Sequence, residues 1–201
     1  MDAVTVVLLV LAGSGLMAVC CMHRIYTIRY RVAFGLLVPQ HGGQITTSMV
    51  ALPSWSLEID GATAQISALP GGVLPGGGGR LPSTFINVLM EMVVPERLCG
   101  ALYPQKGLRF LARLSKDPDV TTGDADFDER FVVRGDDAAG MRELLDAELR
   151  QQLMKRPGLV RVIISGGSFS VAILELTHKR ADLEWLIETA HVLRRRLQPD
   201  I

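Results

Sequence analysis

The most constraining feature of this sequence is a run of 20 residues, Ala3–Met22, that contains no charged side chain. An α-helix of that length would be about 30 Å long, which matches the hydrocarbon core of a lipid bilayer. We therefore predict that this run is a single transmembrane helix. Gly13, Gly15 and Ala18 make it rich in small residues, which would allow a neighbouring helix to approach closely.

Three alternatives to a permanent span fit the sequence less well. A cleaved signal peptide has a basic segment before its apolar core, whereas Met1 and Asp2 precede the core here. A lipoprotein signal has a small residue before the modified cysteine, but Val19 precedes Cys20 and Cys20 precedes Cys21. A buried helix of a soluble protein rarely has so long an uncharged run at a chain end.

The residues around the run predict its orientation. Three arginines and two tyrosines follow it, namely Arg24, Tyr26, Arg29, Tyr30 and Arg31. Only Asp2 and the amino terminus precede it, so the positive-inside rule places the N-terminus outside and the rest of the chain in the cytoplasm. Tyrosine is typical of the membrane interface. We interpret the arginines as a topology signal, with attraction to anionic membrane lipid as the alternative.

The candidate contact residues for membrane or partner subunits are therefore Gly13, Gly15, Ala18, Arg24, Tyr26, Arg29, Tyr30 and Arg31.

The helix is expected to continue beyond the membrane until Pro39 and Gly42-Gly43 end it. Residues 1–38 would then form the anchor with a juxtamembrane extension. Residues 40–201 would form a cytoplasmic domain.

Two β-hairpins are predicted in this domain. The first joins residues 55–60 and 62–68 across Asp60-Gly61, a dipeptide that favours a tight hairpin turn. The second joins residues 160–164 and 169–176 across a Ser-Gly-Gly-Ser turn. Further strands are expected at 84–94 and 127–133.

Two amphipathic helices are predicted over residues 138–155 and 181–197, because apolar residues recur there every three or four positions. The apolar positions are Met141, Leu144, Leu145, Leu149 and Leu153 in the first, and Leu183, Leu186, Ile187, Ala190, Leu193 and Leu197 in the second. Strands joined by tight turns and combined with such helices predict an α+β fold, a small domain with an antiparallel sheet and helices packed on one face.

Two segments are expected to be less regular. Residues 70–82 contain four consecutive glycines and are predicted to be a flexible loop. A phosphate-binding loop would need Gly-Lys-Ser/Thr at the start of a helix, whereas Arg80 is followed by Leu81-Pro82. Residues 95–126 lack a clear period, apart from a short amphipathic helix expected over 108–114.

Composition excludes several classes of protein. Lys plus Arg and Asp plus Glu both number 21, so no overall charge attracts nucleic acid. Three cysteines, two of them adjacent, make no disulfide framework and suit a reducing compartment.

No motif predicts catalysis, a metal or a cofactor. The four histidines have no i, i+4 pair, and neither Cys-x-x-Cys nor Gly-x-Ser-x-Gly occurs. The aspartates between residues 117 and 128 lack the glycine and glutamate of an EF-hand, so we interpret them as a solvated turn. Neither a catalytic, a cofactor-binding nor a metal-binding residue is therefore assigned.

A further pattern is carried by Tyr103-Pro104, Gly107-Leu108, the segment 123–137, Leu144-Leu145 and the Gly166-Gly167 hairpin. Over roughly residues 100–197 this pattern resembles a family of bacterial proteins with one N-terminal membrane helix and a small α+β domain, for which no activity is known. The resemblance implies the fold and the anchor but no chemistry.

These observations favour a non-enzymatic, membrane-anchored accessory or assembly subunit that binds lipid and other subunits of a membrane complex, with no nucleic acid. A membrane-tethered module that senses a ligand or lipid is the first alternative. An enzyme whose site is dispersed along the sequence is the second.

Overall fold

The computed structural model describes residues 3–48, 51–70, 84–92, 98–105, 118–156, 160–175 and 177–198, with the side chains at 3–16, 18, 19, 69, 70 and 84 left aside. The helices are α1 Ala3–His41, α3 Ala125–Arg130, α4 Ala138–Leu144, α5 Ala147–Met154 and α6 Arg180–Leu197. The strands are β1 Gln44–Thr46, β2 Ser54–Ile59, β3 Ala62–Pro70, β4 Thr84–Glu91, β5 Gly100–Pro104, β6 Asp119–Val120, β7 Phe131–Gly135, β8 Val160–Ser165 and β9 Ser168–Ile173.

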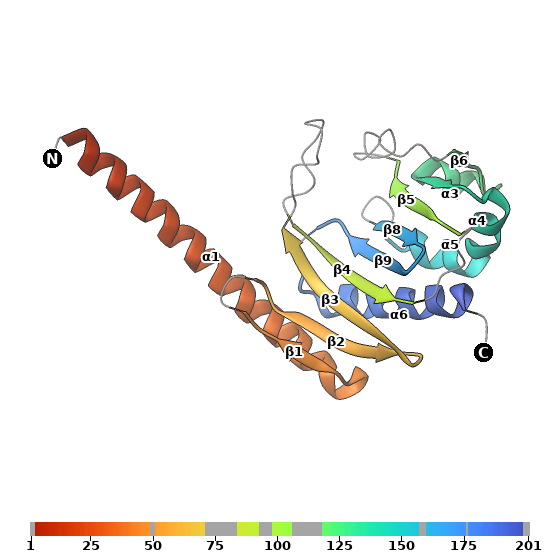
Figure 1. Ribbon diagram of the computed structural model, residues 1–201, viewed down its shortest axis with the longest axis horizontal. Coiled ribbons are helices and arrows are strands. Elements are labelled where there is room, and N and C mark those ends of the chain that lie inside the picture. The colour runs from red at the N-terminus through yellow and green to blue at the C-terminus, as the bar shows by residue number, and fades with distance from the viewer. Residues whose placement is uncertain are drawn as a thin grey trace.

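Within these residues the strands form one antiparallel sheet of nine strands, in the order β1-β2-β3-β4-β9-β8-β5-β7-β6 (Figure 1). The predicted α+β class with an antiparallel sheet is therefore confirmed. The helix α1 projects away from the sheet, and its N-terminal end lies far from the rest of the molecule (Figure 1).

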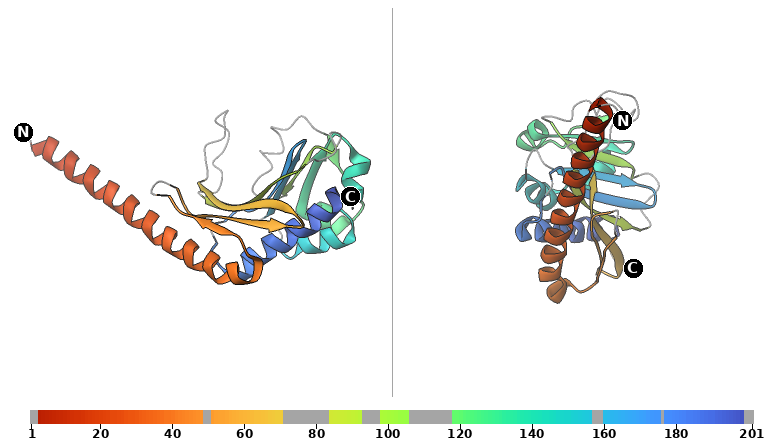
Figure 2. Two further views of the ribbon diagram at one scale, coloured as in Figure 1. Left: turned by 60° about the horizontal axis from the view of Figure 1, so that its bottom comes forward. Right: turned by 90° about the vertical axis from the view of Figure 1, so that its left-hand side faces the viewer.

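One row of apolar side chains crosses the whole sheet and defines its core face. Every neighbour in the row is an in-register partner of the next: Ile45, Trp55, Ile66, Val88, Val171, Val162, Leu102, Val133 and Val120. Helix α1 reaches this face through Phe34, which packs on Trp55. Helix α6 packs against β9, β4 and β2, and α4 and α5 cover the other end of this face; in the left view of Figure 2, α6 runs below the strands.

Both predicted hairpins are confirmed. Strands β2 and β3 pair across Asp60-Gly61, and β8 and β9 pair across Gly166-Gly167. The predicted apolar stripe of the last helix is also confirmed, because every residue assigned to it is buried.

The strand predicted over residues 127–133 is wrong in its first half. Residues 125–130 form α3, and the strand β7 begins only at Phe131. The reason is the carboxylate of Asp124, which accepts a hydrogen bond from the Phe127 amide at 3.2 Å and caps the helix. Phe127 is then buried against Phe131, with 4.8 Å between their ring centroids.

The single helix predicted over residues 138–155 is also wrong, because it is two helices. Helix α4 ends at Leu144, and α5 starts after Asp146, whose side chain accepts from the Leu149 amide at 2.9 Å. All five residues of the predicted apolar stripe are nevertheless buried.

The segment expected to be irregular contains two strands, β5 and β6. In β5, Gly100 allows α4 to approach closely, since an added Cβ would lie 2.8 Å from the Met141 sulfur. The predicted helix over 108–114 lies outside the described residues, and so do residues 71–82 of the loop predicted over 70–82. Its first residue, Pro70, is the last residue of β3.

The N-terminal helix continues three residues beyond the expected end. Pro39 lies inside α1, and Gly42 closes the helix by donating its amide hydrogen to the Val38 carbonyl oxygen at 2.7 Å. Among the residues with described side chains, no helix is both long and apolar enough to cross a membrane. Most side chains of the expected span, Ala3–Met22, lie outside the described part.

Candidate partner-binding surface on the N-terminal helix

One side of α1 belongs to the core of the domain. Tyr30, Phe34 and Leu37 are fully buried, and Ala33 is nearly so. These positions recur at intervals of three and four residues, which places them on one side of a helix. The core therefore extends across the division expected between residues 38 and 40.

The turn after α1 holds the helix in place. Trp55 donates its indole N–H to the Gly42 carbonyl oxygen at 3.0 Å. Gly43 has a φ of +92°, and a Cβ there would meet the Ser56 carbonyl oxygen at 2.1 Å. Gln40 accepts a hydrogen bond from Arg180 of α6 at 2.9 Å. The direction of α1 relative to the sheet is thus determined by packing and by polar contacts.

Tyr30, expected among the contacts with membrane or partner, is instead placed inside the domain. Its ring lies 5.7 Å from that of Phe34, and its hydroxyl is buried without a hydrogen-bond partner among the described residues. Burial raises the pKa of the Tyr30 phenol, and the nearby Tyr26 adds to this rise. Tyr26 itself is half-buried against the same core.

The opposite side of α1 exposes large apolar side chains. Ile25, Ile28, Val32 and Leu36 are between 51% and 60% exposed. With 3.6 residues per turn they lie within an arc of about 80°, on the side opposite the buried residues. Met22 is also exposed, so the surface continues from the end of the expected membrane span. We call Ile25, Ile28, Val32 and Leu36 the apolar stripe.

The three predicted arginines flank the apolar stripe. Arg24, Arg29 and Arg31 are all exposed, and no carboxylate of the described residues forms an ion pair with them. The surface is therefore apolar in the middle and positively charged at its edges. For Gly13, Gly15 and Ala18 the structure places only the backbone, which lies in the N-terminal part of α1.

Sequence reasoning included the arginines but missed the apolar stripe. The signal was present, because the stripe recurs at intervals of three and four residues, as the buried side does. Helix α1 therefore has two apolar sides, the buried side and the apolar stripe, with arginines between them. This pattern is typical of a helix with two packing surfaces and not of a simple extension of a span.

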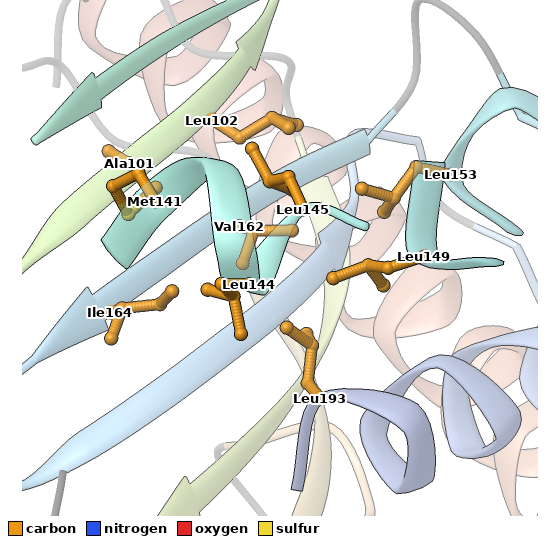
Figure 3. A pocket seen from close by; sticks show the side chains of 10 residues that line it. All are labelled: Ala101, Leu102, Met141, Leu144, Leu145, Leu149, Leu153, Val162, Ile164 and Leu193. Atoms are coloured by element: carbon orange, nitrogen blue, oxygen red, sulfur yellow. The ribbon is translucent and has the colours of Figure 1, made fainter. Parts of the chain in front are cut away.

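An enclosed apolar pocket lies elsewhere, between the sheet and helices α4, α5 and α6 (Figure 3). Ten apolar side chains point into it, among them Leu102 and Val162 from the sheet and Leu144, Leu149 and Leu193 from the helices. Its volume is about 10 Å³, close to the least that one water molecule needs. The pocket is therefore part of the packed core and not a ligand site.

In the described segments, several acidic side chains stabilise helix ends and turns. Asp124, Asp137 and Asp146 cap helices, and Asp128 accepts hydrogen bonds from the Thr122 amide and hydroxyl. Among the described residues, no group of three or more Asp, Glu, His or Cys side chains could hold a metal ion.

No protein-family model and no curated protein sequence matches this chain. Among solved structures, the crystal structure of the mycobacterial trehalose monomycolate transport factor A, TtfA, is similar, with a TM-score of 0.45 and 14% sequence identity. The similarity covers 75% of this chain and 76% of that one.

Proposed function

We propose that this protein is a non-enzymatic accessory subunit of a membrane protein complex. Residues 3–22 anchor it in the bilayer, and the α+β domain lies on the cytoplasmic side. The observation that supports this most directly is the apolar stripe on α1, which begins near the end of the expected span and which the domain leaves uncovered.

The position of the apolar stripe favours protein over lipid as its occupant. Along the helix axis, Val32 and Leu36 lie about 15 and 21 Å beyond Met22. The lipid headgroups extend only about 5–8 Å beyond the hydrocarbon core. Lipid therefore covers Ile25 at most, and the distal half of the stripe requires a protein surface.

The charge around the stripe indicates what kind of protein surface fits. Arg24, Arg29 and Arg31 have no acidic partner in the described part of this chain. The occupant is therefore an apolar helix face of another subunit with Asp or Glu at its edges, close to the membrane. Burying side chains of this size contributes about 1–2 kcal/mol each, whereas the exposed ion pairs mainly determine orientation.

The test is the size of the assembly that mild detergent extracts from native membranes. We expect the wild-type chain to migrate within a larger complex, and Val32→Asp combined with Leu36→Asp to release it as a monomer. The matched control is Gln151→Asp, at an exposed position of α5, which should leave the complex intact. A wild-type monomer, or a complex that survives the double substitution, would contradict the proposal.

A further inference from the structure

The face of the sheet opposite the helices carries its own row of in-register residues. Ser67, Asn87, Ala172 and Arg161 are successive partners across β3, β4, β9 and β8. This row lies in the middle of the sheet, where neighbouring strands are about 4.8 Å apart. It combines two potential hydrogen-bond donors, Asn87 and Arg161, around a small residue.

Arg161 extends across Ala172 towards β4. Its guanidinium carbon lies 4.9 Å from the centroid of the Phe85 ring, which comes from β4 two residues before Asn87. A large side chain at position 172 would block this path. The guanidinium group is thereby held over β4, the strand that also carries Asn87 on the same face of the sheet.

The donors of Arg161 are not used within the described chain. Its Nε atom is buried and has no hydrogen-bond partner. By contrast, Arg134, Arg150, Arg156 and Arg196 each form an ion pair with a carboxylate. Burial lowers the pKa of the Arg161 guanidinium, which reflects a positive charge shielded from water, although the nearby Tyr103 partly offsets this effect.

Asn87 and Gln105 on this face also have side-chain hydrogen-bonding capacity that no described residue uses. Asn87 is only 6% exposed, and its Oδ1 atom accepts from the Ser67 hydroxyl at 2.9 Å, which leaves its amide donors for another acceptor. Gln105, two residues after Tyr103, has a buried Oε1 atom without a partner. Buried polar groups are nearly always paired, so Arg161 and Gln105 fit a polar group that comes from outside the described residues.

Part of the surroundings of the donors is apolar. Phe85 and Ala172 are buried, and in the next in-register row on this face the half-buried Leu89 and Ile163 lie on either side of Ser170. From this geometry we infer that Arg161, Asn87 and Phe85 form a binding site for the head group of an amphipathic anion, a carboxylate or phosphate that carries an apolar chain. The guanidinium fork and the Asn87 amide bind the anionic oxygens, and the apolar side chains of Phe85, Leu89 and Ile163 bind the chain.

The experiment is calorimetric titration of the full chain in lipid nanodiscs, with empty nanodiscs subtracted. The probes are hexanoate, hexyl phosphate, inorganic phosphate and hexyltrimethylammonium. We expect the two anionic hexyl probes to bind at least tenfold more tightly than inorganic phosphate, and the cation not to bind. Equal affinity for inorganic phosphate would overturn the assignment of an amphipathic ligand.

Substitutions distinguish the loss of this binding site from a general loss of affinity. Arg161→Gln should weaken the affinity for both anionic hexyl probes at least tenfold, and Arg161→Lys should retain part of it. Arg194→Gln is the matched control, because the Nε atom of Arg194 is also buried and unpartnered but lies on α6. If Arg161→Gln does not fold, Asn87→Ala provides the same test. Undiminished binding in a folded variant at Arg161 or Asn87, or equal loss in Arg194→Gln, would overturn the inference.

Discussion

Tyr30 is a residue whose surroundings make a specific prediction about alkaline pH. Its ionisation is disfavoured in the folded state, so its folded pKa lies above the ordinary value of 10.0. The unfolded chain therefore loses this proton first, and the stabilisation from the neutral phenol, complete below pH 10, is lost as the pH rises. The hydroxyl meanwhile forms no hydrogen bond with any residue that the structure describes.

We therefore expect Tyr30→Phe to keep or raise the free energy of unfolding at pH 8. In alkaline solution, the wild-type protein should lose stability faster than the variant. Urea unfolding of both proteins from pH 8 to 11 measures this difference. A variant destabilised by more than about 1 kcal/mol at pH 8 would show that the hydroxyl has a partner.

Asp182 is the residue whose removal should be most costly outside the apolar core. Its carboxylate is buried, forms an ion pair with Arg156 and accepts a hydrogen bond from the Thr177 hydroxyl. Asp182→Ala leaves the partly exposed Arg156 without its partner, and we expect a loss of about 3 kcal/mol in urea unfolding. The control is Asp136→Ala, at an exposed position, which should change stability by less than about 0.5 kcal/mol. Equal effects of the two substitutions would contradict this assignment.

At the scale of elements, local signals predicted some parts and tertiary contacts decided the others. The Asp60-Gly61 and Gly166-Gly167 turns specify their hairpins within a few residues, so both hairpins could be predicted. The start of β7 and the break between α4 and α5 depend on Asp124 and Asp146. Aspartate is common both in turns and in caps, so the residue type alone does not distinguish the two roles.

The connection between α1 and β1 provides a test at this scale. Gly43→Ala would combine a positive φ with a clash against the Ser56 carbonyl oxygen, and we expect thermal unfolding to reveal a loss of about 2–3 kcal/mol. Gly42→Ala is the matched control. Its φ is also positive, at +70°, but open space surrounds its Cβ position, so we expect a loss of about 1 kcal/mol. Similar losses in both variants would mean that the close approach of β2 to Gly43 does not constrain α1.

At the scale of the whole molecule, the two faces of the sheet differ in the residues they carry. Its core face could be predicted in outline, because alternation along each strand predicts which residues point inward. The opposite face could not, since the row that contains Asn87 and Arg161 depends on the strand order β3-β4-β9-β8. Likewise, the arginines of the candidate surface on α1 were predicted from membrane topology, whereas the apolar stripe required knowing which side of α1 the domain covers.

The central claim is that residues 3–22 hold the domain at a membrane, so that the apolar stripe on α1 meets a partner there. Extraction of native membranes with alkaline carbonate tests the anchor directly, with a chain that begins at His23 as the comparison. We predict that the full chain stays in the membrane pellet, whereas the shortened chain appears in the supernatant. Release of the intact full chain into the supernatant would contradict the account.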